Sequence, residues 1–280
     1  RAQSLRPYPY YDAINVLAPR SGNYNYHALL LSVEKRFSQD LTFLFSYTAG
    51  KLISDSVIGA VDFGGVEQVQ ETGYQNGFDR AAERSVDPSD VSQRAVISAL
   101  YELPFGAGNR WDSGNRFVNG LISGWQVNAI GTMQTGLPII VRGANNNLAN
   151  RPNIIGSAKL DNPTAQRWFN TDVFVNPPPY TYGNVGRALP DMRGPGTVNW
   201  DLSLLKNTRL REGLTLQFRA EAFNFLNHVN LFPPASGGNI RSGVAQFVPG
   251  PDGLNRSGAF GVITGSRDAR NVQFGLKLIF

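Results

Sequence analysis

The sequence predicts an all-β protein: an antiparallel, up-and-down transmembrane β-barrel segment of about seven or eight strands. Three observations lead to this prediction. Apolar and polar residues alternate in runs of about ten residues, the connections between these runs are either short or very long, and the chain combines 30 Gly and 17 Pro with only 17% charged residues. Alternation with period two is the pattern of a strand with one apolar and one polar face.

The predicted strands follow one another along the whole chain. Residues 1–22 are expected to be a loop that carries one partial strand near Ala13. Proline cannot donate to a ladder, so Pro104 ends one strand, and residues 137–142 could extend another strand past an irregularity at Gly136. The full set of predicted strands is 24–37, 41–49, 93–103, 124–134, 198–207, 214–222 and 271–280.

The last strand shows the alternation most clearly. Its even-numbered residues are apolar and its odd-numbered residues, apart from Ile279, are polar or glycine: Val272, Phe274, Leu276, Leu278 and Phe280 against Asn271, Gln273, Gly275 and Lys277. An aromatic residue at the end of a barrel strand can lie in the interfacial girdle. The alternative is an ordinary sheet strand that finishes the chain.

The connections favour a membrane barrel over a soluble β domain. Those at 38–40 and 208–213 are short and that at 104–120 is intermediate, whereas three are long: 54–92, 143–197 and 227–269. Counting antiparallel strands back from Phe280 places every short turn on one side and every long loop on the other. Outer-membrane barrels pair short periplasmic turns with longer extracellular loops, whereas a soluble sandwich would turn about every 8–12 residues.

Composition excludes several other classes of protein. The chain has no Cys, which excludes disulfide scaffolds and thiol-ligated metals. Its net charge of +5 is scattered, so no nucleic-acid partner is expected. No run of eighteen apolar residues indicates a transmembrane helix. The chain begins at Arg1 without a signal-peptide pattern, so we expect a mature segment or part of a longer protein.

The sequence predicts no catalytic, cofactor-binding or metal residue, and we expect a protein that is not an enzyme. The only histidines, His27 and His228, lack metal-ligand spacing, and His228 is expected to form polar contacts at a loop edge. The glycine-rich stretch 105–108 lacks a following helix and Lys, so it is interpreted as a turn. Four acidic residues could bind Ca²⁺, but their spacing favours a solvated face: Asp79, Glu83, Asp87 and Asp90.

Polar residues on one predicted strand are candidates for contacts inside the barrel. Gln217, Arg219 and Glu221 alternate with apolar residues and are expected to face the lumen, where they could contact a plug or substrate. The alternative is ordinary wetting with charge pairing between Arg219 and Glu221. Among the aromatic residues, Trp125 and Trp200 are expected to face lipid or its interface, whereas Trp168 and Tyr180 could stack on sugars.

Several segments resemble one transporter family. The stretch GPGTVNWDLSLLKNTRLREGLTLQFRAEAFNFLNHVNLFPP from Gly194, and FGVITGSRDARNVQFGLKLIF from Phe260, resemble the end of the barrel in Oar-like TonB-dependent transporters. So do YNYHALLLSVEKRFSQDLTFLFSYTAGK, VISALYELPFG and RWFNTDVF. The resemblance implies a larger, nominally 22-stranded barrel, of which residues 1–280 would be the C-terminal portion. The plug, a carboxypeptidase-regulatory-like domain and the TonB-contacting box would lie upstream and be absent.

This resemblance implies a role in energised uptake across the bacterial outer membrane. The barrel would be the scaffold and the long loops would select an unidentified ligand. The implied partners are outer-membrane lipid, the protein's own plug and remaining strands, and the TonB complex acting through the plug. The alternatives are a small standalone outer-membrane barrel with a structural or adhesive role and, third, an outer-membrane hydrolase.

Overall fold

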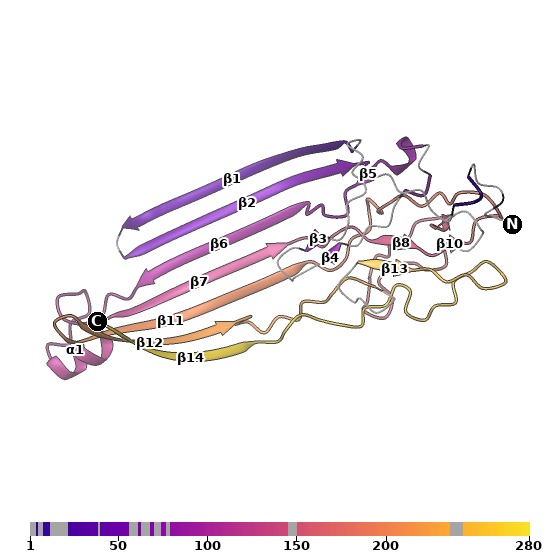
Figure 1. The fold of residues 1–280 in the computed structure, drawn as a ribbon. Coiled ribbons are helices and arrows are strands. Elements are labelled where there is room, and N and C mark those ends of the chain that lie inside the picture. The colour runs from indigo at the N-terminus through magenta and orange to yellow at the C-terminus, as the bar shows by residue number, and fades with distance from the viewer. Residues whose placement is uncertain are drawn as a thin grey trace.

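The protein forms one long, curved antiparallel sheet with a folded loop region at one end (Figure 1). The computed structural model describes residues 4, 8–11, 22–38, 40–55, 61–62, 68–69, 74–76, 79–144, 150–235 and 243–280. The main sheet is eight-stranded, with the order β1-β2-β6-β7-β11-β12-β14 and the short β5 paired to β2. Its strands are β1 (Tyr24–Ser38), β2 (Leu41–Ser54), β5 (Ser85–Val86), β6 (Gln93–Glu102), β7 (Trp125–Gln134), β11 (Thr197–Arg211), β12 (Leu214–Phe223) and β14 (Asn271–Ile279).

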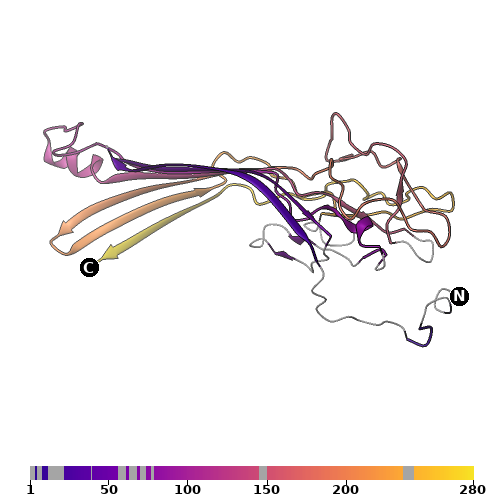
Figure 2. The ribbon, with the colours of Figure 1, turned by 90° about the horizontal axis from the view of Figure 1, so that it is seen from above.

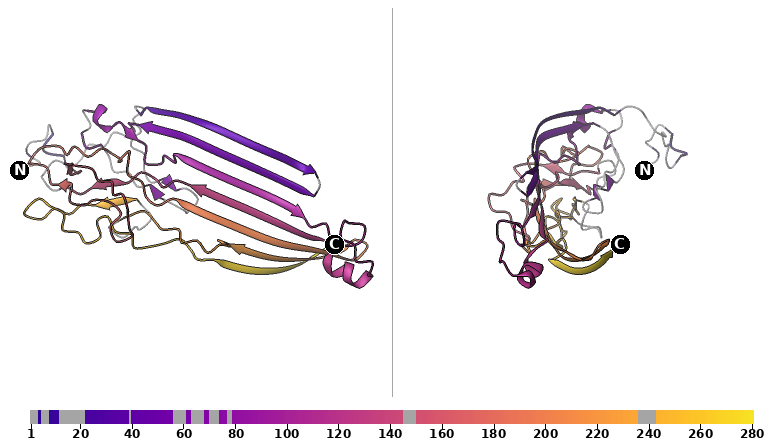
Figure 3. Two further views of the ribbon diagram at one scale, coloured as in Figure 1. Left: turned by 180° about the vertical axis from the view of Figure 1, so that it is seen from behind. Right: turned by 90° about the vertical axis from the view of Figure 1, so that its left-hand side faces the viewer.

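This architecture confirms the predicted all-β, antiparallel, up-and-down arrangement. Consecutive long strands are neighbours, and each pairing along the path is antiparallel. The predicted partial strand near Ala13 lies outside the described residues. The sheet curls into an arc (Figure 3, right), but β1 and β14 are its two ends, so the barrel is not closed. No helix in the described part of the chain is both long and apolar enough to cross a membrane.

Strand register keeps the two sets of side chains on separate faces across all seven long strands. Starting at β14, Leu276 pairs with Phe218, Phe218 with Lys206, and Lys206 with Trp125. On the opposite face, three residues before Leu276, Gln273 pairs with Glu221, and Glu221 pairs with Ser203. Since a slip of one residue would exchange the faces, this register joins the apolar sides of the strands into one continuous face. The opposite face is mainly polar, with some aliphatic residues such as Leu205.

The short connections lie at one end of the sheet and the long ones at the other, as strand parity predicted (Figure 1). The connection between β6 and β7 contains a helix that the alternation gave no reason to expect, α1 (Arg116–Ile122). Its N-cap is Asn115, whose Oδ1 accepts from the backbone N–H groups of Phe117 at 2.9 Å and Val118 at 3.3 Å. The glycine-rich stretch before it is a turn as predicted, with φ of 104° at Gly106 and 78° at Gly108.

At the opposite end the long connections fold together around an apolar core, and we call this the loop unit (residues 55–92, 135–196 and 224–270, where described). Residues 137–142 do not extend β7, contrary to the prediction: β8 (Ile140–Arg142) instead pairs in parallel with β13 (Val244–Gln246). The remaining short elements are β3 (Val61–Asp62), β4 (Gln68–Val69), the 3₁₀ helix η2 (Ala81–Glu83), β9 (Asn153–Ile154) and β10 (Phe174–Val175). Phenylalanines 169, 174, 247 and 260 meet edge to face at the centre, with centroids 5.0–5.9 Å apart.

Buried charges also tie the first long connection to the second. Arg151 forms a 2.6 Å ion pair with Glu83, and both side chains are almost fully buried. Asp90 pairs with Arg193, and Asp87 accepts from the buried Ser54 hydroxyl at 2.5 Å. The prediction of a solvated acidic face is therefore wrong for Glu83, Asp87 and Asp90, which are 1–2% exposed. Each of these carboxylates has a cationic or hydroxyl partner from a distant segment of the chain. Such a partner offsets the loss of hydration when a carboxylate is buried.

Candidate functional site

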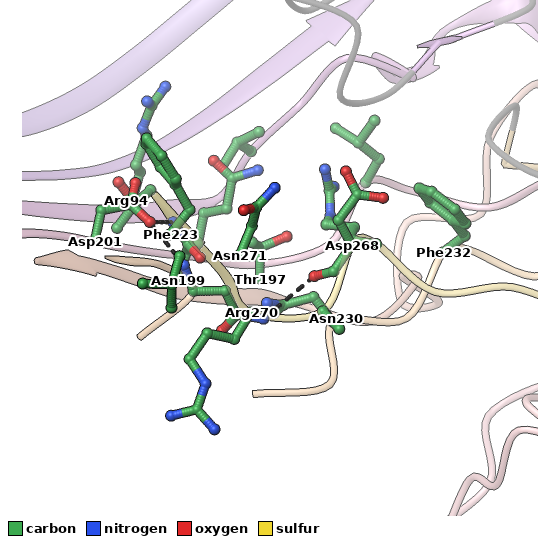
Figure 4. A pocket seen from close by; sticks show the side chains of 18 residues that line it. Arg94, Thr197, Asn199, Asp201, Phe223, Asn230, Phe232, Asp268, Arg270 and Asn271 are labelled. Atoms are coloured by element: carbon green, nitrogen blue, oxygen red, sulfur yellow. Dashed lines mark hydrogen bonds between the residues drawn. The ribbon is translucent and has the colours of Figure 1, made fainter. Parts of the chain in front are cut away.

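A pocket of about 960 Å³, lined by both polar and apolar residues, lies where the concave, mainly polar face of the sheet meets the loop unit (Figure 4). Its lining comes from five strands of the sheet (β6, β7, β11, β12 and β14), from the segments that leave β12 and return to β14, and from Val91 and Leu137. It is a surface hollow rather than a closed cavity. The pocket is of the size that small-molecule sites in proteins occupy.

The sheet side of the pocket consists of adjacent rows set by strand register. Gln134 of β7 pairs with Arg94 of β6 on one side and with Thr197 of β11 on the other. In the next row Thr132 pairs with Asn199. All of these residues lie on the polar face at the loop end of their strands, so their side chains project to the same side. The sheet thus presents a row of hydrogen-bonding groups around the guanidinium of Arg94.

Two buried asparagines build the other side. Asn224, which has φ of 48°, begins the sharp turn after β12, and its backbone N–H donates to Asp201 at 2.9 Å. Its amide also donates to the carbonyls of His228 at 3.0 Å and Asp268 at 3.3 Å. Asn230 pairs through both its Oδ1 and Nδ2 with the backbone N–H and C=O of Val198, at 2.8 Å each. These side chains replace strand partners where the ladder ends.

Charged side chains at the rim remain available to a ligand. Asp201 Oδ1 already accepts from Asn199 and Asn224. By contrast, the exposed side chains of Arg94 and Asp268 form no hydrogen bond or ion pair with another described residue. Figure 4 shows Arg270 pointing away from the others, and its guanidinium makes a 3.3 Å contact with the carbonyl of Phe225. The pocket therefore offers one free cation and one free carboxylate within a ring of amide and hydroxyl groups.

These groups suit binding by hydrogen bonds and charge. The described lining combines Thr hydroxyls, amides, carboxylates and guanidinium groups with six apolar side chains, and it contains no His, Lys, Ser or Cys. The apolar side chains are those of Val91, Leu137, Phe223, Phe232, Ala269 and Val272. No group of three or more His, Asp or Glu among the described residues is placed to hold a metal ion. An arginine fork such as Arg94 recognises carboxylate or phosphate oxygens, whereas a free aspartate accepts from hydroxyl or amine groups. A polar small molecule with both kinds of group would match this arrangement.

The residues that the sequence singled out for the lumen lie on the polar face but outside the pocket, nearer the short connections. Gln217 donates to Asn207 at 2.9 Å and accepts from Arg219 Nε at 2.7 Å. Glu221 accepts from Gln273 at 2.6 Å. The expected pairing of Arg219 with Glu221 is thus replaced by two separate hydrogen bonds, because each side chain has an amide partner in reach.

Other candidates fall in different places. Trp168 packs against the core of the loop unit and donates through Nε1 to the carbonyl of Arg193 at 2.7 Å. Tyr180 is about half exposed in the same unit. The His228 backbone N–H donates to Asn224 at 2.9 Å, which confirms its predicted polar contacts at a loop edge.

Sequence reasoning missed Arg94, Asp201 and Asp268 as a set. Arg94 and Asp201 each lie near the loop end of a polar strand face, and that shared position was the available signal. Asp268 lies in the segment that leads into β14, and this segment has no alternating pattern from which its position could be predicted.

Comparison with known proteins identifies the family. The model of the family described as outer membrane beta barrel domain matches residues 1–273 of the 280. No curated protein and no solved structure matches the chain significantly. The family match covers nearly the whole chain and agrees with its antiparallel sheet, its alternating faces and its long loops at one end. The chain therefore belongs to the outer membrane beta barrel domain family, and its location is the outer membrane.

Proposed function

We propose that this chain forms part of the wall and the ligand-selecting loops of a TonB-dependent outer-membrane transporter, which takes up a polar small molecule with energy supplied through a plug. The observation that carries the proposal is the pocket on the concave face beside the loop unit, where charged and hydrogen-bonding groups lie among apolar ones. A structural or adhesive barrel would have no need for a hollow of about 960 Å³ with a free arginine and a free aspartate. The resemblance to Oar-like transporters supplies the TonB part of the proposal.

The open edges of the sheet support a larger assembly. β1 and β14 each lack a partner on their outer side within the main sheet. Unpaired backbone groups are not tolerated in lipid, so a spanning sheet must close on itself or on further strands. In the proposed transporter, additional strands of the same protein would join β14 to β1. Its plug would face the concave side, where Gln217, Arg219 and Glu221 would meet it.

Uptake by cells tests the function directly. Cells that make the complete protein and cells that lack it are grown in the same mixed medium, and compounds removed from the medium are identified by mass spectrometry. The proposal predicts that one polar compound is depleted only when the protein is present, and that a protonophore abolishes this depletion. Depletion that a protonophore leaves unchanged would refute energised transport. Loss of adhesion or envelope integrity alone would favour a structural barrel.

A variant then links uptake to the pocket. Arg94→Ala should weaken binding of the depleted compound by about 10- to 100-fold, since hydrogen bonds to charged groups contribute about 1.5–3 kcal/mol. The matched control is Arg167→Ala, which removes an equally charged side chain from an exposed ion pair with Asp172 in the loop unit. Equal affinity for the two variants, with both assembled in the membrane, would exclude Arg94 from the binding site.

A further inference from the structure

The helix α1 lies on the apolar, convex face of the sheet at the end that carries the short connections. Lys206, an apolar-face position of β11, donates through Nζ to three carbonyls at the C-terminal end of the helix, those of Gly120, Leu121 and Ser123, at 2.7–3.1 Å. Trp125 Nε1 also donates to the carbonyl of Leu121, at 3.0 Å. Figures 2 and 3 show the helix outside the arc of the sheet, on the side away from the concave face. Its position relative to the barrel wall is therefore fixed by side-chain contacts.

One side of α1 is apolar and uncovered. Phe117 is 86% exposed, Leu121 71% and Val118 42%. At helical spacing these three residues share one side, whereas Asn119 turns inward and donates to Asp112 at 2.6 Å. Leu121 and Ile122 also line a small apolar hollow together with Trp125 and Leu204 of the sheet. The helix thus extends the apolar face of the sheet beyond the strand ends, and its own apolar side is exposed.

The sheet beside α1 has the aromatic pattern of a membrane interface. Trp125 meets Phe218 edge to face at 6.5 Å, and Phe218 stacks on Phe274 at 6.3 Å. Lys206 lies 5.1 Å from the Trp125 ring. Aromatic girdles and lysine side chains that reach toward the polar layer mark the level of lipid headgroups in outer-membrane barrels. The uncovered side of α1 lies next to this row.

The connection around α1 also carries positive charge. Arg116 is exposed at the start of the helix, and Arg110 lies 5.9 Å over the ring of Trp111. The nearby carboxylate of Asp112 is occupied by the backbone N–H groups of Gly108 and Gly114 in addition to Asn119. An apolar side flanked by arginines, with its one acid already bonded, is the composition of an interfacial helix on phospholipid.

We propose that α1 is an interfacial anchor: Phe117, Val118 and Leu121 insert among phospholipid acyl chains beside the barrel wall, and Arg110 and Arg116 contact lipid phosphates. The occupant of this surface is phospholipid because the surface is continuous with the apolar face of an outer-membrane barrel. This role is independent of the proposed transport function, since it requires only that the sheet be part of a barrel in a lipid bilayer.

Site-directed spin labelling tests the proposal, because these 280 residues contain no cysteine. Phe117→Cys and, as a matched control, Gly120→Cys are introduced into the complete protein, which is labelled and reconstituted in vesicles of phosphatidylethanolamine and phosphatidylglycerol. Gly120 lies on the same helix toward its polar side, and a Cβ there would meet no atom within 4 Å. Collision of the label with oxygen, which partitions into lipid, is compared with collision with a water-soluble nickel chelate. Heat-modifiable migration on gels confirms that both variants are assembled.

The expected result is a lipid-like label at position 117, with high oxygen and low nickel collision rates, and a water-like label at position 120. Two water-like labels would overturn the proposal. A label at position 117 shielded from both reagents would also overturn it, because a protein partner would then cover the helix. The arginine contribution is tested with Arg110→Gln/Arg116→Gln: a shallower label at position 117 supports the phosphate contacts, and an unchanged depth refutes them.

Discussion

The buried pair between Glu83 and Arg151 should control the stability of the loop unit. The ion pair is 2.6 Å long, and the exposed fractions of the two side chains are 1% and 6%. Glu83 Oε1 also accepts from the backbone N–H of Gln75 at 2.8 Å. Glu83→Ala therefore removes the only acidic partner of the Arg151 guanidinium among the described residues and leaves a buried cation behind.

The expected magnitude follows from that burial. Breaking a buried pair by removing one partner costs about 3–5 kcal/mol, because the remaining charge cannot regain its hydration. Each 1.4 kcal/mol is about a factor of ten in an equilibrium constant. Opening of the loop unit should therefore become roughly 10²- to 4 × 10³-fold more frequent. Replacing both residues by methionine should restore much of the stability, since an apolar pair of similar volume needs no compensating charge.

Hydrogen exchange of the assembled protein, followed by mass spectrometry, measures this effect segment by segment. Exchange should accelerate in residues 150–189, whereas the amides of β11 and β12 should keep their protection. The control is Asp172→Ala, which breaks an ion pair whose side chains are 52% and 79% exposed. Pairs of that kind contribute about 0–1 kcal/mol. Equal exchange in the Glu83 and Asp172 variants would refute the reasoning that burial makes the first pair decisive.

Three further outcomes are expected. Phe218→Arg should reduce membrane assembly more than Gln217→Arg, by up to about 1 kcal/mol in vesicle-folding titrations, because charge on the lipid face is unfavourable even near the interface; equal tolerance would mean that the faces are assigned wrongly. Hydrogen bonds from Asn23 and the nearby Arg80 lower the pKa of Asp55, so this contribution is present above about pH 4 and is lost as the pH falls through the lowered pKa. As the pH falls through this range, amide exchange at the start of β1 should become faster in the natural protein, and Asp55→Asn should abolish this pH dependence. A Cβ at Gly183 would overlap the carbonyl oxygen of Arg151, so Gly183→Ala should lower the free energy of unfolding of the loop unit by about 1–3 kcal/mol, as measured by limited proteolysis.

The strands were accessible to sequence reasoning because their pattern is local. Alternation with period two reveals each strand and its apolar side without reference to any partner. Strand ends were less certain: β2 continues to Ser54 and β11 to Arg211, beyond the predicted 49 and 207. The extension of β2 contains the adjacent apolar residues Leu52 and Ile53, and that of β11 has only Leu210 between Arg209 and Arg211. Neither continues a clear apolar face, although the backbone ladder continues.

The pocket illustrates what local patterns cannot provide. Arg94 and Asp201 are 107 positions apart in the chain, and Asp201 and Asp268 are 67 apart. They line one pocket only because register aligns β6, β7 and β11 and because the last loop folds back onto the sheet. Gln217, Arg219 and Glu221 share the polar face of β12, but their distance from the pocket along that face depends on where the loops pack.

The sequence alone therefore determined the all-β class, the identity of the long strands and the separation of their faces, since each depends on the order of residues within about ten positions. Only the tertiary structure decided the loop unit, the burial of its acids and the place of α1 on the convex face. Arg187 reaches Ser54 across 133 residues, and Arg193 reaches Asp90 across 103. A carboxylate can be buried when a cation from a distant segment of the chain contacts it, and the local sequence around the carboxylate does not indicate whether that contact forms.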